Sequence, residues 1–170
     1  MVYNKSFIFG ILLLTLVAIS SCVKYSFKGA LPSYLKTISV ELFEDRSRER
    51  WVGLQEKLTE DVVNAFVNDN TLTVIDDPKK ADLVIKGSIL SIQTRSTSIT
   101  QEELVEEQQL VLTVKVECLN QQSNKPLWSG NISEFGVVSG TGDLAEREAA
   151  LDVAVEKIVE EIVNKTIAAW

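Results

Sequence analysis

Two stretches of this sequence carry residue types that could act on a charged ligand. Residues 140–145, Gly-Thr-Gly-Asp-Leu-Ala, match the G-x-G-x-x-A pattern, in which a strand-to-helix turn holds dinucleotide phosphates. That site also needs a parallel strand after the helix, and the chain ends with the helix, so we predict a plain turn before a helix cap. The second stretch is a carboxylate run that matches no EF-hand loop, and we expect it to be solvated charge at a hairpin end. It contains Glu102, Glu103, Glu106 and Glu107.

Histidine is absent from all 170 residues. Its absence removes Ser-His-Asp and Cys-His nucleophile pairs, histidine general bases and nearly all catalytic zinc sites. The formal net charge is -7, and an acidic domain is a poor general ligand for nucleic acid or an anionic bilayer surface. We therefore predict a protein that is not an enzyme, uses no metal or cofactor and binds no nucleic acid.

One charged loop carries residues suited to contacting a partner. Arg46, Arg48 and Arg50 alternate with other residues and are followed by Trp51, which would anchor an interface if it were exposed. Plain surface is the competing interpretation, because neighbouring acidic residues cancel the arginine charge. These four residues are our first candidate partner contacts.

The N-terminus has the three parts of an export signal in order: Lys5, an apolar stretch from Phe7 to Ile19, and two small residues before Cys22. The apolar stretch is too short to cross a bilayer comfortably as a permanent helix. Ile19-Ser20-Ser21-Cys22 resembles the bacterial lipobox, which implies a diacylglycerol thioether on Cys22, cleavage before it and acylation of the new amine. Two or three acyl chains would make the anchor effectively permanent. An ordinary secretory signal that ends near a cysteine is the alternative.

The domain organisation follows from this signal. We expect residues 1–21 to be a cleaved signal peptide, 22–33 a lipidated lead and 34–170 a single α/β domain. With Cys22 lipidated, Cys118 has no partner for an internal disulfide. Its strand parity with Val114 and Val116 places it on an apolar face, where we expect it to pack as a small hydrophobe.

Hydrophobic periodicity predicts two helices and five strands. The strands are expected at 37–43, 72–75, 83–99, 104–119 and 127–138. The helices are expected from Leu54 to about Asn68 and from Asp143 nearly to Trp170, the second with a capping-box-like pair of Asp143 and Glu146 and an apolar stripe that starts at Leu144.

The element order β-α-β-β-β-β-α predicts an α+β fold. Two amphipathic helices and one largely antiparallel sheet of about four to five strands bury each other most simply as a two-layer sandwich, with both helices on one sheet face. The other face is left for solvent or a partner.

Several segments resemble the LptE family, lipoproteins that assist lipopolysaccharide assembly at the outer membrane. The opening Cys22-Val23-Lys24-Tyr25-Ser26-Phe27-Lys28-Gly29 is similar to the family's cysteine, aromatic-x-aromatic and glycine start. The other matching segments are 35–46, 58–60, 81–89 and 110–116.

The resemblance implies a protein without enzymatic activity that plugs the large LptD β-barrel, helps it fold and binds lipopolysaccharide in transit. Lipopolysaccharide phosphates need basic residues, and the main ones on the two long strands are Arg95 and Lys115, which we add to the candidate partner contacts. The residue after Cys22 is Val23, not the aspartate associated with inner-membrane retention, so we expect the periplasmic face of the outer membrane.

A second resemblance implies a different partner class. Residues 37–46, 72–76 and 81–87 also look like lipoproteins related to penicillin-binding-protein activators and curli-secretion proteins. That resemblance implies a periplasmic regulator or a secretion-pore subunit. The Tyr25-x-Phe27-x-Gly29 opening favours the LptE resemblance.

Overall fold

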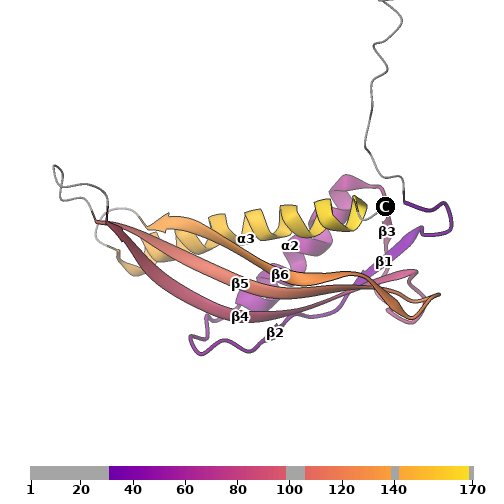
Figure 1. The fold of residues 1–170 in the computed structure, drawn as a ribbon, viewed down its shortest axis with the longest axis horizontal. Helices are drawn as coiled ribbons and strands as arrows, with labels where there is room; N and C mark the ends of the chain where they lie inside the picture. The colour runs from indigo at the N-terminus through magenta and orange to yellow at the C-terminus, as the bar shows by residue number, and fades with distance from the viewer. Residues whose placement is uncertain (1–30, 99–105, 139–141, 169–170) are drawn as a thin grey trace, which may run out of the picture.

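The structure, a computed structural model, describes residues 31–98, 106–138 and 142–168 (Figure 1). The predicted signal peptide, Cys22 and most of the predicted lead lie outside these residues. The elements are β1 (Thr37–Val40), β2 (Glu44–Asp45), α2 (Leu54–Asp69), β3 (Thr73–Val74), β4 (Leu83–Ser98), β5 (Glu106–Asn120), β6 (Lys125–Val138) and α3 (Leu144–Ile167).

One sheet of order β3-β1-β4-β5-β6, with β2 also beside β4, forms the first layer. The long strands β4, β5 and β6 are antiparallel, whereas β1 and β2 pair with β4 in parallel and β3 pairs with β1 in parallel. Helices α2 and α3 form the second layer on one sheet face (Figure 1). The predicted α+β two-layer architecture is therefore confirmed, with a sheet that is mixed at its β1 side.

The prediction of one strand over 37–43 is wrong in one respect, because the structure has two separate strands there. Strand β1 ends at Val40, and β2 begins at Glu44. Continued alternation from Val40 would bury Leu42 and expose Phe43, but Leu42 is 57% exposed and Phe43 is fully buried. The N–H of Phe43 donates to Thr59 Oγ1 of α2 at 3.1 Å. Its ring fills the space that a side chain at Gly87 would need. Contacts with α2 and β4 thus override the local alternation.

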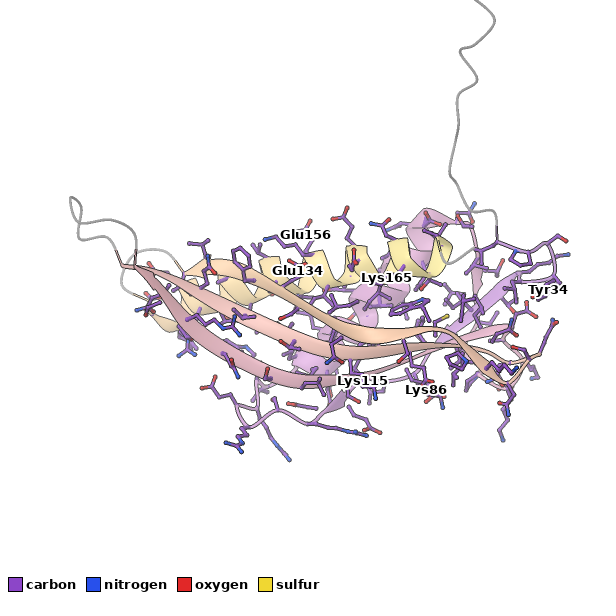
Figure 2. All side chains as sticks on the ribbon, in the orientation of Figure 1. Tyr34, Lys86, Lys115, Glu134, Glu156 and Lys165 are labelled. Carbon is purple, nitrogen blue, oxygen red and sulfur yellow. The ribbon has the colours of Figure 1, made fainter. Side chains whose placement is uncertain are left out.

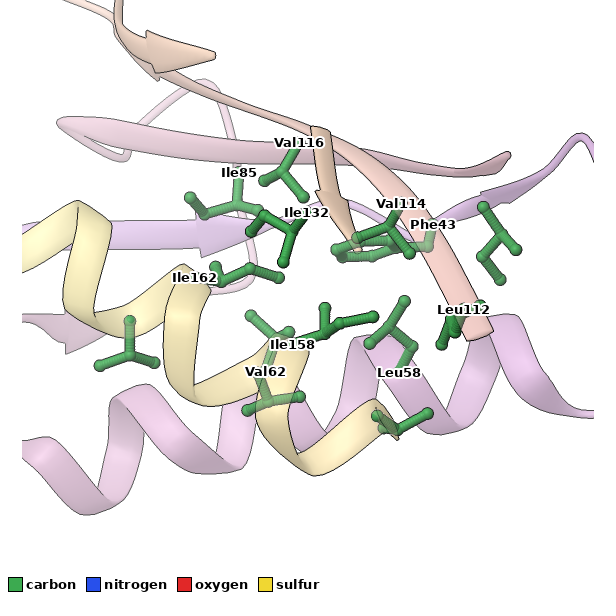
Figure 3. Close-up of a cluster of buried hydrophobic side chains, with 14 of the residues drawn as sticks. Phe43, Leu58, Val62, Ile85, Leu112, Val114, Val116, Ile132, Ile158 and Ile162 are labelled. Atoms are coloured by element: carbon green, nitrogen blue, oxygen red, sulfur yellow. The ribbon is translucent and has the colours of Figure 1, made fainter. Parts of the chain in front are cut away.

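Alternation on the long strands builds the core as expected. Leu83, Ile85 and Ile89 of β4 are buried toward the helices, and a bulge between Ile89 and Ser91 shifts the next buried residue to Ile92. The facing residues on β5 and β6 are also buried, and Figure 3 shows many of them packed against α2 and α3. They are Leu110, Leu112, Val114, Val116, Cys118, Ile132 and Val138. Burial raises the pKa of the Cys118 thiol to about 12, in keeping with its predicted packing role.

Both helices present the predicted apolar stripe to the sheet. In α2 the buried residues are Leu54, Leu58, Val62 and Phe66. Helix α3 starts with the predicted capping box, in which Asp143 accepts from the Glu146 N–H and Glu146 accepts from the Asp143 N–H. Leu144, predicted to belong to the α3 stripe, is 71% exposed because it lies in the first turn beyond the sheet contact. No helix in the described part of the chain has the length and hydropathy of a membrane span.

Candidate interaction surface

The middle of the sheet face turned away from α2 and α3 carries a group of small polar side chains. The register pairs Ser88 of β4 with Lys115 of β5 and Lys115 with Asn131 of β6, and all three point to this face. Thr113 and Ser133 lie on it beside them, and their hydroxyls hydrogen-bond at 2.8 Å. Figure 2 shows Lys86 and Lys115 on the sheet, with Glu156 and Lys165 on α3. The face left for solvent or a partner by the two-layer prediction thus has a polar centre, with charged side chains beside it and Val111, Phe135 and Val137 further along.

A groove of about 280 Å³ opens on this face and brings together two of the predicted contact residues, Arg46 and Lys115. Most of its charges are already paired. Arg46 Nη2 lies 2.6 Å from Glu44 Oε2, and Lys86 Nζ lies 3.0 Å from Glu41 Oε1. Lys115 forms no ion pair with any described residue. The groove therefore offers one free ammonium, with Glu117 also lining it.

The other arginines of the charged loop do not join this groove. Ser47 accounts for the separation, because its N–H and hydroxyl both donate to Asp45 Oδ1, at 2.8 and 2.6 Å, in a turn that ends β2. Past that turn, Arg48 lines a second groove with Glu49 and residues 90–93 of β4. Arg95 is exposed further along the same strand. The predicted arginine cluster is thus spread over several surfaces.

Arg50 and Trp51 line a third groove, beside the first turn of α3. Trp51 is only partly buried, and the guanidinium of Arg147 lies 5.9 Å from the centroid of its ring. Arg147 also approaches Glu49, with Nη2 3.9 Å from Oε2. Trp51 is therefore held against the body of the domain and does not project as a free anchor.

Sequence reasoning missed the exposed apolar residues that surround Trp51. Val52 is 99% exposed and Leu144 is 71% exposed, and both line the same groove as Trp51. Each lies at a helix start, and a residue in a first turn can point away from the buried stripe. Their position beside a helix start was the feature of the sequence that could have identified them as exposed.

Asp82 is a second missed residue, and its role is structural. Its Oδ2 accepts from the N–H groups of Lys36 and Thr37, at 2.9 and 3.0 Å, and from Thr37 Oγ1 at 2.9 Å. The hydrogen bond from the Lys36 backbone, followed by those from Thr37, lowers the pKa of the Asp82 carboxyl from its usual 3.8. Asp82 therefore ties the start of β1 to the start of β4.

The described residues contain no group of three or more carboxylate, cysteine or histidine side chains that could hold a metal ion.

Comparison of the sequence with protein families gives one match. Residues 35–166 fit the family model LptE, described as lipopolysaccharide-assembly. Among curated proteins, no sequence matches the chain.

Solved structures with this fold come from several bacteria. A hypothetical protein from Chlamydia trachomatis superposes with a TM-score of 0.60 and 13% identity, over 79% of this chain and 96% of that one. An uncharacterised lipoprotein B from Nitrosomonas europaea gives 0.54 and 16%, over 82% and 85%. The PelC dodecamer from Paraburkholderia phytofirmans gives 0.50 and 14%, over 76% and 89%. At these identities the likeness concerns the fold alone.

Proposed function

This chain belongs to the LptE family of lipopolysaccharide-assembly proteins, and we propose that it is a lipoprotein without enzymatic activity that partners and plugs an LptD β-barrel. The observation that carries the proposal is the family match, which spans residues 35–166 and so includes nearly all of the folded domain. Lipopolysaccharide assembly by such a protein requires binding and positioning, not bond making. The absence of histidine from the sequence agrees with that role.

The polar sheet face supports the plug. The lumen of a wide β-barrel is polar and hydrated, so a domain that enters it can keep hydroxyl, amide and charged side chains in contact with water there. The face built around Ser88, Thr113, Asn131 and Ser133 has that character. An apolar face of this size would instead favour self-association.

We further propose that lipid on Cys22 holds the domain at the periplasmic face of the outer membrane, after removal of residues 1–21. The described chain begins at residue 31, at the end of the domain opposite the end of β4 and the start of β5 (Figure 1). Strand β4 has 16 residues, which span about 50 Å at roughly 3.3 Å per residue. An anchor on the short lead would thus leave the hairpin free to extend away from the membrane attachment.

The barrel, and not lipopolysaccharide, is the principal partner in this proposal. Phosphate groups are held by several basic side chains, but carboxylates already neutralise Arg46 and Lys86 and leave Lys115 as the free cation of its groove. Arg95 is another exposed basic residue on the long strands, at a separate place on β4. Contact with lipopolysaccharide through these residues would be weak and sensitive to salt.

The fold alone does not exclude the rival partner class, because the PelC dodecamer, an assembly of many subunits, shares it. The family match favours the barrel. A periplasmic regulator or a secretion-pore subunit would have no reason to affect lipopolysaccharide, and this difference provides the test.

Depletion of the protein from its own bacterium tests the proposal directly. We expect newly made lipopolysaccharide to stop reaching the cell surface, and the LptD barrel to lose its folded form. Restoring the wild-type chain or Cys118→Ala should rescue both, whereas Cys22→Ala should lose lipid labelling and rescue neither. Unchanged lipopolysaccharide export after depletion contradicts the proposal.

A further inference from the structure

The edge of β4 that faces away from β5 is only half covered. Strands β1 and β2 pair with β4 along this edge as far as Asp45, opposite Ile89. The turn at Asp45 and Ser47 then takes the chain away from the sheet. From Ser91 to Ser98, no strand among the described segments pairs with this edge.

The register identifies which backbone groups point to the open edge. Glu41 N–H donates to Ile85 O and Arg46 N–H to Ile89 O, so the residues opposite Cys118 and Val114 turn their backbone groups away from β5. After the bulge, the residues opposite Leu112, Leu110 and Gln108 have the same phase. They are Ile92, Thr94 and Ser96. All three direct N–H and C=O groups to this edge, but Ile92 is only 4% exposed, so the groups open to a partner are those of Thr94 and Ser96, which are exposed.

The opposite edge of the sheet, formed by β6, shows the same alternation of backbone groups, but there a side chain covers an outward carbonyl. The same alternation directs the carbonyl of Phe135 outward from β6, and Lys157 Nζ of α3 donates to that oxygen at 2.9 Å. The Lys157 ammonium also lies 4.7 Å from the centroid of the Phe135 ring. A helix that covers a strand edge, here with a charged side chain bound to a main-chain carbonyl, discourages pairing with another chain. Within the part of the chain that the structure describes, no side chain covers the β4 edge in this way.

A groove with an uncompensated positive charge runs beside the open edge. It has a volume of about 320 Å³ and lies between the loop at Arg48 and Glu49 and residues 90–93 of β4. Glu49 approaches Arg147, whereas neither Arg48 nor Arg95 forms an ion pair with a described residue. Both arginines are exposed. In a chain of net charge -7, this edge is a local cationic site.

The register shows where the cationic part of the β4 edge ends, and its charge determines which kind of segment can bind there. The register places acidic residues of β5 opposite Thr97 and Ser98, so the cationic part of the edge ends near Ser96. A second copy of this chain would bring its own Arg48 and Arg95 to the edge, and like charges across a strand pair are unfavourable. The charge therefore selects an acidic segment of another protein.

We propose that an extended acidic segment of a partner protein adds to β4 as an extra strand along Gln93–Ser96. Its main chain bonds to the outward groups of Thr94 and Ser96, which supply affinity without sequence preference. Its carboxylates contact Arg48 and Arg95, which supply charge selectivity. The site is independent of the proposed barrel function, because it needs only the folded domain and an acidic strand.

The test uses the full-length protein in detergent and a fluorescein-labelled peptide of alternating valine and glutamate, about eight residues long. We expect saturable binding by fluorescence anisotropy that weakens as salt is added. Two matched peptides isolate the two contributions. One carries lysine in place of glutamate, and the other keeps glutamate but has N-methyl groups on alternate backbone amides, and neither should bind.

Paired variants locate the site on the protein. Thr94→Pro removes an outward N–H that no β5 residue uses, and proline is tolerated on an edge strand when its missing N–H faces solvent. It should weaken peptide binding by about tenfold, the ratio that one backbone hydrogen bond supplies. Thr94→Ala keeps the N–H and should bind as wild type does. Arg48→Glu and Arg95→Glu should each weaken binding and remove part of its salt dependence.

Amide hydrogen exchange gives a readout that charge attraction alone cannot produce. On binding, exchange should slow at Thr94 and Ser96 and stay unchanged at Gln93 and Arg95, whose N–H groups face β5. Equal binding of the N-methylated peptide would show attraction without strand pairing and overturn the proposal. So would an absence of saturable binding, or dimers of the protein alone that Thr94→Pro converts to monomers.

Discussion

Gly136 of β6 is the position where one added methyl group should do the most damage to the layer packing. A Cβ built on Gly136 would lie 2.0 Å from the carbonyl oxygen of Ala150, and 2.7 and 2.8 Å from its C and Cα. All three are backbone atoms of α3, so no side-chain rotation relieves the overlap. Bringing the oxygen to 3.0 Å requires α3 to move by about 1 Å away from β6.

The loss of stability follows from the contacts that this movement of α3 would disturb. Helix α3 packs its buried stripe on β5 and β6, so a shift of this size strains one contact and loosens several others. Overpacking of a well-packed core costs about 1–3 kcal/mol. For a domain of this size, about 1 kcal/mol corresponds to roughly 2–4 °C in Tm. We expect Gly136→Ala to lower Tm by about 4–10 °C.

Gly130 supplies a matched control on the same strand and the same face. It lies opposite Val116, in phase with Gly136 opposite Leu110, but a Cβ at Gly130 meets nothing within 4 Å. Gly130→Ala should leave stability unchanged or raise it by about 0.5 kcal/mol, since it reduces the freedom of the unfolded chain. Thermal unfolding followed by circular dichroism measures both variants. Equal Tm values for the two would refute the close packing of α3 on β6.

Three further predictions concern single side chains. Because hydrogen bonds lower the pKa of Asp82 in the fold, its contribution to stability is complete above pH 4 and is lost as the pH falls through the lowered pKa. Asp82→Asn should therefore destabilise at pH 7 and show a smaller further loss than wild type in urea titrations at lower pH. Cys118, buried and with its pKa raised to about 12, should react with a thiol reagent at pH 8 only after unfolding in urea. Asp143→Ala removes the α3 cap and should cost about 1 kcal/mol in the free energy of unfolding, whereas Asp143→Asn should retain most of it.

The features predicted correctly from sequence are those set by local pattern. The alternation from Leu110 to Cys118 correctly places Leu110, Leu112, Val114, Val116 and Cys118 on the core face, and the spacing of Asp143 and Glu146 predicts the capping box that forms. Both depend on residues a few positions apart. The two-layer arrangement then follows because two amphipathic helices and one sheet have few other ways to bury their apolar faces.

The features missed from sequence depend on distant contacts. Phe43 is buried because Gly87 leaves space for its ring and Thr59 accepts its N–H, and both lie far along the chain. The bulge at Leu90 has no glycine or proline to mark it, and it decides which β4 residues face the core beyond Ile89.

The candidate contacts illustrate the same limit. Arg46, Arg48 and Arg50 are close in sequence, yet the turn at Asp45 and Ser47 directs them to different grooves. Lys115 joins Arg46 only through the pairing of β2 with β4 and of β4 with β5. Cys22 lies outside the described residues, and its lipidation stays a prediction from the lipobox.

The stoichiometry of the native complex tests the central claim most directly. The full-length protein, tagged at its C-terminus and extracted gently from its own bacterium, should isolate with an LptD-type β-barrel protein, one copy of each, by native mass and peptide identification. Isolation instead as a ring of identical subunits, or with a murein synthase and no barrel, would contradict the account.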